Sequence, residues 1–395
     1  MRFQKITVCV LNFAIFLSWL VSFSSASAQT EVQSPWTGGN GIRMKMSEIM
    51  ARENARRAKV ESAGALPEEH HYIIHRQHGE LLQNPASPDS ALPAASTNGP
   101  VASSLSQSFG VSFTGATLAE TRSYPPDTMG AVGPTQFIVA VNGRFRSFNK
   151  ITGSADGVLN ADPDVFFASV MTPGVSNFTS DPRIRYDRIS GRWFIIIIDV
   201  PNNGASANRV MFAVSDAATI TTNSIWTFFQ FQQDLVSPAG DNGNFADYPT
   251  LGIDANALYI GVNLFGTRGQ GSFNNTTAFV VRKSSLLSNG PIVATAFRDL
   301  IPKGMAGGAY TPQGVDNFDP SATEGYFIGV NSRYFGKLNL RRISNPGGAP
   351  SMSANIEITV PTTGGTLKVP HLGNTGGSAG TLDGLDYRLI SAMMR

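Results

Sequence analysis

Cysteine is almost absent from this chain of 395 residues, in which Cys9 is the only one. Cys9 lies within the first 28 residues, which have the pattern of a removable segment. The rest of the chain can therefore form no disulfide, no thiolate zinc site and no cysteine nucleophile. A domain without such links is held together by core burial alone, and roughly 290 residues from residue 106 onward are sufficient for that.

Charge is scarce as well, since only 15% of the residues are charged and the formal net charge is +2. Such a low charge density gives no field that would capture nucleic acid or an anionic membrane, so both are excluded as partners. Glycine and proline are abundant, with 40 and 23 residues. Together with many Phe, Val, Ile and Thr residues, they indicate short strands joined by turns.

The N-terminus has the features of a secretory signal. Arg2 and Lys5 precede a largely apolar run over residues 6–23, and Ala26-Ser27-Ala28 matches the small-residue cleavage pattern. We predict a signal peptide over residues 1–28, with an uncleaved membrane anchor as the alternative. The mature protein is then secreted, periplasmic or on the cell surface, with no membrane span. Export without disulfides favours a bacterial envelope protein.

Residues 29–105 have the composition of a leader. Residues 29–42 are polar and glycine-rich, residues 44–63 have helical spacing of Met and Ala, and residues 84–106 are rich in Pro, Ala and Ser. We therefore predict a flexible leader with one short helix over residues 29–105, followed by the globular domain over residues 106–395.

A turn–strand–turn–strand unit recurs along the globular part. Its copies lie about 50 to 70 residues apart, the length of one four-stranded propeller blade. The tripeptide Gly-Val-Asn occurs in two copies, at residues 261–263 and 329–331. The sequence predicts an all-β propeller, with a β-sandwich as the alternative. The last unit has no closing partner strand, so we expect the propeller to be incomplete at its C-terminus. Each unit opens on an aspartate: Asp127, Asp181, Asp247, Asp319 and Asp386.

Three of these units resemble a known group of proteins. Residues 125–134, 181–193 and 247–249 are similar to the first blades of large bacterial secreted proteins with sialidase-like propellers. The resemblance covers roughly residues 106–395 and implies the fold. It does not imply sialidase activity. The Arg-Ile-Pro motif of sialidases is absent, and their Asp-box motif (Ser-x-Asp-x-Gly-x-x-Trp) is matched only in part, by Ser215-Asp216 and Trp226.

Three residue types are candidates for a ligand site. Paired carboxylates could serve glycoside hydrolysis, although aspartates at repeated positions also cap turns. Arginines could converge on an anion, or be solvated charges. Tyrosines beside Pro or Gly could stack on sugar rings. The candidates for ligand binding are Asp181, Arg183, Arg185, Asp247, Tyr248, Arg333 and Arg388, and no catalytic residue is assigned.

A calcium site is the one cofactor that the sequence raises. Residues 241–247 gather oxygen donors around a glycine, and calcium binds six to eight oxygens. The EF-hand pattern is incomplete, because Gly243 stands at the third position and no glutamate follows at the twelfth. The candidate ligands are Asp241, Asn244 and Asp247.

These features lead to two functional hypotheses. The first is a secreted propeller that binds extracellular glycan or protein ligands and has no catalytic motif. The alternative is a sialidase-like glycoside hydrolase that draws carboxylates from several blades. Two carboxylates roughly 5 to 10 Å apart in an open cleft would favour hydrolysis. The sequence leaves open whether the protein is an enzyme and which oligomeric state it adopts.

Overall fold

The computed structural model places most of the globular part of the chain. The predicted signal peptide lies outside the residues that it describes, which are 34–62, 70–71, 81–88, 110–266, 271–302, 307–367, 369–371, 381–382, 384 and 386–395. Within this part of the chain, none of the helices has the length and apolarity that a membrane crossing requires.

Four antiparallel sheets follow one another along the chain, and each is a meander of adjacent strands. Blade 1 contains β6 (Met129–Val132), β7 (Gln136–Val141), β8 (Arg144–Asn149) and β9 (Ala155–Ala161). Blade 2 contains β10 (Asn177–Asp187), β11 (Arg192–Pro201), β12 (Arg209–Ser215) and β13 (Ile225–Gln232).

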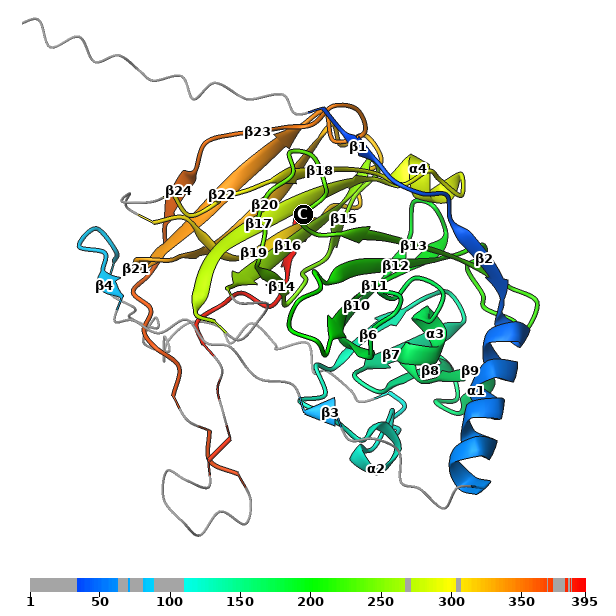
Figure 1. Cartoon of the computed structure of the whole chain (residues 1–395). Helices are drawn as coiled ribbons and strands as arrows, with labels where there is room; N and C mark the ends of the chain where they lie inside the picture. Colours follow the sequence, from blue (N-terminus) through cyan, green and yellow to red (C-terminus); the bar gives the residue numbers. More distant parts are fainter. Residues whose placement is uncertain are drawn as a thin grey trace, which may run out of the picture.

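The next two sheets repeat this plan. Blade 3 contains β14 (Phe245–Asp247), β15 (Gly252–Ile253), β16 (Ala257–Phe265), β17 (Phe273–Arg282) and β18 (Val293–Phe297). Blade 4 contains β19 (Ala309–Asp316), β20 (Glu324–Asn331), β22 (Lys337–Ser344), β23 (Ser351–Met352) and β24 (Ile356–Thr359), and β25 (Ala392–Met393) lies parallel to β19. Figure 1 shows the four sheets as an arc, with blade 1 at one end and blade 4 at the other. The predicted β-propeller of four-stranded blades is confirmed.

Short elements complete the structure between and beside the blades. Three short helices lie in the connections. Four short strands form two small pairings away from the blades, of β3 with β5 and of β4 with β21. They are α2 (Leu118–Thr121), α3 (Pro163–Phe167), α4 (Lys283–Leu287), β3 (His70–His71), β4 (Leu82–Gln83), β5 (Ser123–Tyr124) and β21 (Tyr334–Phe335).

The core consists of apolar layers between the blades. In β11, Trp193, Ile195 and Ile197 pack toward blade 1, whereas Phe194, Ile196 and Ile198 pack toward blade 3. Because successive side chains of a strand point to opposite faces, a continuous apolar run is what a blade buried on both sides requires. The same alternation recurs at the junction of blades 3 and 4, where Tyr259, Val280, Phe327 and Ile343 are buried together.

The predicted short helix is present as α1 (Met46–Ser62), but the segment around it differs from the expected flexible leader. β1 (Trp36–Thr37) pairs with the outer strand of blade 3, and β2 (Ile42–Lys45) pairs with the outer strand of blade 2. The buried Glu53 of α1 accepts hydrogen bonds from Arg57 at 2.7 Å and from Arg144 of blade 1 at 3.1 Å. This segment therefore adds one strand each to blades 2 and 3, and its helix binds Arg144 of blade 1.

Candidate functional site

The inner strands of blades 2, 3 and 4 are kinked at corresponding places, and a similar kink lies just before the inner strand of blade 1. The kinked residues have left-handed backbone, with φ of 40° at Asp127, 59° at Asp181, 50° at Tyr248 and 45° at Thr311. A proline follows in blades 2, 3 and 4, and the strand register shifts beside the kink in β10 and β19. Residues other than glycine seldom adopt this backbone, and such strain is concentrated at functional sites.

Side-chain hydrogen bonds join the kinks of blades 1, 2 and 3. The Asn142 amide donates to Oδ2 of Asp127 at 2.8 Å, and its Oδ1 accepts from the Asp181 backbone N–H at 3.0 Å. The Tyr248 backbone N–H donates to Oδ2 of Asp181 at 3.2 Å. We call Asp127, Asn142, Asp181, Arg183, Asp247, Tyr248 and Arg388 the kink cluster.

Two carboxyl groups of the kink cluster share a proton. Burial, the charge of Asp181 and a hydrogen bond with that carboxylate raise the pKa of Asp127 to about 8. Burial and the nearby charge of Asp247 raise the pKa of Asp181 to about 6. Between these two pH values the Asp127 carboxyl keeps its proton and donates it to the ionised Asp181. Near neutral pH the pair therefore carries one negative charge.

This shared proton predicts a stability that falls as the pH rises. Both carboxyls bind protons more tightly in the folded chain than at their ordinary pKa of 3.8. Their contribution to folding is therefore complete below about pH 4 and is lost as the pH passes about 6 and then about 8. Urea unfolding at intervals from pH 5 to 9 should show this fall. Asp127→Asn should flatten it above pH 6, and equal slopes in the two proteins would contradict the shared proton.

Two arginines of the kink cluster lie against one tyrosine ring. The guanidinium of Arg183 is 4.6 Å from the centroid of the Tyr248 ring, and that of Arg388 is 4.3 Å from it. Arg183 is held by the Pro249 carbonyl at 2.7 Å, and Arg388 pairs with Asp386 at 2.6 Å. Both guanidinium groups therefore have protein partners and add positive charge beside the three aspartates.

The structure thus gathers five of the seven predicted ligand-binding residues in one place: Asp181, Arg183, Asp247, Tyr248 and Arg388. Arg185 pairs with Asp316 at 2.8 Å, toward the other end of the inner strands. Arg333 lies in the turn after β20, where its carbonyl accepts from the Leu82 backbone N–H.

Sequence reasoning missed Asn142 as a site residue and placed Asp127 only as the opening of a unit. The signal for Asn142 is present, because Asn142 directly follows Val141 at the end of β7, and Val330-Asn331 ends β20 in blade 4. Asp319, in contrast, lies in an exposed turn and caps Ser321, at 2.9 Å from its backbone nitrogen. Thr311 takes the kink position of blade 4, so the repeated aspartates are not equivalent in space.

Two of the three calcium candidates, Asp241 and Asn244, already bind other protein groups. The carboxylate of Asp241 pairs with Arg298 and accepts from the Thr277 hydroxyl at 2.8 Å. The Asn244 amide oxygen accepts from Asn274 at 3.1 Å. Within the described ranges, no group of three or more His, Cys, Asp or Glu residues is arranged to hold a metal ion. Calcium binding by residues 241–247 stays a prediction.

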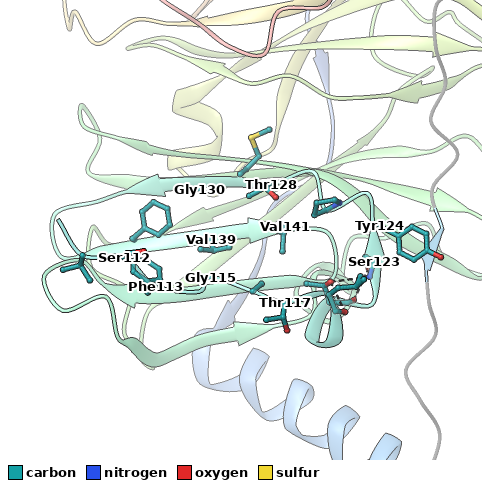
Figure 2. Close-up of a pocket in the computed structure, with 17 residues that line it drawn as sticks. Ser112, Phe113, Gly115, Thr117, Ser123, Tyr124, Thr128, Gly130, Val139 and Val141 are labelled. Carbon is teal, nitrogen blue, oxygen red and sulfur yellow. Dashed lines mark hydrogen bonds between the residues drawn. The ribbon is translucent and has the colours of Figure 1, made fainter. Parts of the chain in front are cut away.

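A groove with a volume of about 920 Å³ lies on the face of blade 1 that points away from blade 2. Figure 2 shows Phe113, Val139 and Gly130 among the residues that line it. Its walls contain aliphatic, aromatic and hydroxyl side chains but no charged or amide group. The charged and amide side chains described above therefore lie in the kink cluster rather than in this groove.

No protein-family model matches the chain, and no curated protein matches it. Among solved structures it is similar to a xylan β-1,4-xylosidase from Bacillus halodurans C-125, with 12% identity, a TM-score of 0.32 and coverage of 58% of this chain and 41% of that one. An exo-β-1,3-galactanase from Phanerochaete chrysosporium with galactose has 13% identity, a TM-score of 0.31 and coverage of 59% and 50%. A neuraminidase-like protein of subtype N11 from A/flat-faced bat/Peru/033/2010 has 10% identity, a TM-score of 0.30 and coverage of 60% and 60%. The chain spans less than two thirds of each.

Proposed function

We propose that this chain is a secreted propeller that binds an extracellular glycan at the kink cluster. The observation that carries the proposal is the convergence of unlike polar groups from three blades. The Asn142 amide joins Asp127 and Asp181 through hydrogen bonds of 2.8 and 3.0 Å, and the Tyr248 backbone N–H donates to Asp181 at 3.2 Å. Sugars are recognised by a few fixed polar groups that bind their hydroxyls, and the kink cluster gathers groups of this kind.

Binding is favoured over hydrolysis by the contact between the two carboxyls. Glycosidases that retain configuration hold their carboxyl groups about 5 to 5.5 Å apart, and inverting enzymes about 6.5 to 9.5 Å apart, to admit the sugar or a water molecule. Asp127 and Asp181 hydrogen-bond to each other directly. A glycosidic bond cannot lie between two groups in contact, so this pair serves as a polar recognition element.

The test is a glycan array probed with the purified chain, run beside hydrolysis assays on a panel of aryl-glycosides. We expect binding to at least one glycan class without turnover. Asp181→Asn should weaken binding about tenfold or more, because it removes a charged hydrogen-bond partner. Asp319→Asn is the matched control, since this aspartate lies in an exposed turn, and it should bind as the wild type does.

The outcomes separate the hypotheses. Turnover of an aryl-glycoside that is lost in Asp181→Asn or Asp247→Asn would establish the hydrolase instead. Equal binding by Asp181→Asn and the wild type would remove the site from the kink cluster. Absence of any glycan binding, with capture of an extracellular protein that depends on Asp181, would make the ligand a protein.

A further inference from the structure

A small pocket lies at the outer edge of blade 2, on the side where Phe228 packs in the core shared with blade 1. It has a volume of about 100 Å³ and is formed by residues 39–42, the turn after α3, and strands β12 and β13. Its polar side chains are those of Asn40, Ser169, Arg209 and Gln230. Among the described residues that line it, Arg209 is the only charged one. The pocket therefore presents one cation among neutral groups.

The Arg209 guanidinium is held in place by the turn after α3. Its Nη1 donates to the carbonyls of Val170 and Met171, each at 3.0 Å. These contacts leave the opposite edge of the group unused. The Nε atom on that edge is buried and has no hydrogen-bond partner within the described part of the chain. Arginine uses its Nε–Nη2 edge for paired hydrogen bonds to oxyanions such as carboxylate and phosphate.

Asp199 is the acid whose charge acts on Arg209, but its oxygens accept from other groups. Oδ1 accepts from the Arg209 backbone N–H at 2.7 Å, and Oδ2 accepts from the Thr172 backbone N–H at 2.7 Å. Burial lowers the pKa of Arg209, although the charge of Asp199 opposes this shift. A partly buried guanidinium costs free energy unless a counter-charge offsets its desolvation. An anion in the pocket would supply that counter-charge.

Ser169 adds a hydroxyl to the same pocket. Its Oγ is buried and, over the ranges that the structure describes, has no hydrogen-bond partner. Buried polar atoms are nearly always paired in folded proteins, so two unpaired ones in one pocket indicate that a further group binds there. An oxyanion would accept two N–H bonds from Arg209 and one O–H bond from Ser169. A water molecule would pair the hydroxyl but would leave the charge of Arg209 without compensation.

We propose that this pocket binds a single oxyanion group, a carboxylate, sulfate or phosphate, on the Nε–Nη2 edge of Arg209 and the hydroxyl of Ser169. The volume of about 100 Å³ is that of roughly three water molecules, which admits one such group. The site is separate from the kink cluster, because β12 is two strands outward from β10, which carries Asp181. The proposal therefore does not rest on glycan binding there.

NMR titration of the purified chain, isotope-labelled at its arginines, tests the proposal through the Nε–H signal of Arg209. Sodium sulfate, sodium phosphate and sodium acetate are added separately, each against sodium chloride of equal ionic strength. We expect the Arg209 signal, assigned by its loss in Arg209→Lys, to shift saturably with at least one of the three anions. Ser169→Ala should weaken this binding about three- to tenfold, because it removes one hydrogen bond. Circular dichroism confirms that each variant is folded.

Arg192 is the matched control within the same blade. It is a half-buried arginine whose Nη1 donates to the Ser215 carbonyl at 2.9 Å, but it does not line the pocket. Its Nε–H signal should not shift saturably. Equal, unsaturable shifts at Arg192 and Arg209 would show an adventitious ion only and would overturn the proposal. The same holds if the Arg209 signal does not move, or if Ser169→Ala binds the anion as tightly as the wild type.

Discussion

Replacement of Lys283 by methionine should lower the free energy of unfolding by about 3 to 5 kcal/mol. The Lys283 ammonium, in α4 of blade 3, lies 2.5 Å from Oδ2 of Asp187 at the end of β10 in blade 2, and 2.6 Å from the Asp254 carbonyl. The side chains of Lys283 and Asp187 are only 2% and 1% exposed. Without the ammonium, Asp187 becomes an uncompensated charge between two blades, which is the costly case for buried ion pairs.

Chemical unfolding in urea measures this loss. Lys337→Met is the matched control, because the pair of Lys337 with Glu357 is exposed and such pairs contribute about 1 kcal/mol or less. The double variant Lys283→Met with Asp187→Asn should recover part of the loss, since it removes both charges. A loss for Lys283→Met no larger than that of the control would show that water reaches the junction.

The substitution Gly261→Ala should cost about 3 kcal/mol of stability, at the upper end for overpacking. A methyl group at Gly261 would lie 1.9 Å from the Pro312 carbonyl oxygen, where the backbones of blades 3 and 4 approach each other. Gly252 and Gly314 are equally confined, with their added methyl groups 2.2 Å and 2.1 Å from backbone atoms. Because backbone rather than flexible side chains blocks the methyl group, the two sheets must separate to admit it.

Gly39→Ala is the control, since a methyl group there would meet no atom within 4 Å. Its effect should stay within about 0.5 kcal/mol. Thermal unfolding of both variants gives the comparison. A Gly261→Ala protein as stable as the control would mean that blades 3 and 4 are not packed backbone to backbone.

The sequence by itself determined the strands and their repetition. The run of isoleucines at residues 195–198 is apolar at every position, and only a strand buried on both faces suits such a run. The fold class and the helix that precedes the propeller followed from patterns of this local kind. They can be read from sequence because hydrophobic periodicity and turn residues act over a few neighbouring positions.

Only the tertiary structure decided which residues meet. Asp127 and Asp181 share a proton although 53 residues separate them, and Glu53 of the supposed leader binds Arg144. The repeated aspartates look alike along the chain, yet Asp319 lies in an exposed turn while Thr311 occupies the fourth kink. The reason is physical. Contacts between distant segments depend on how the four sheets pack against one another, and the residue pattern within one segment does not determine that packing.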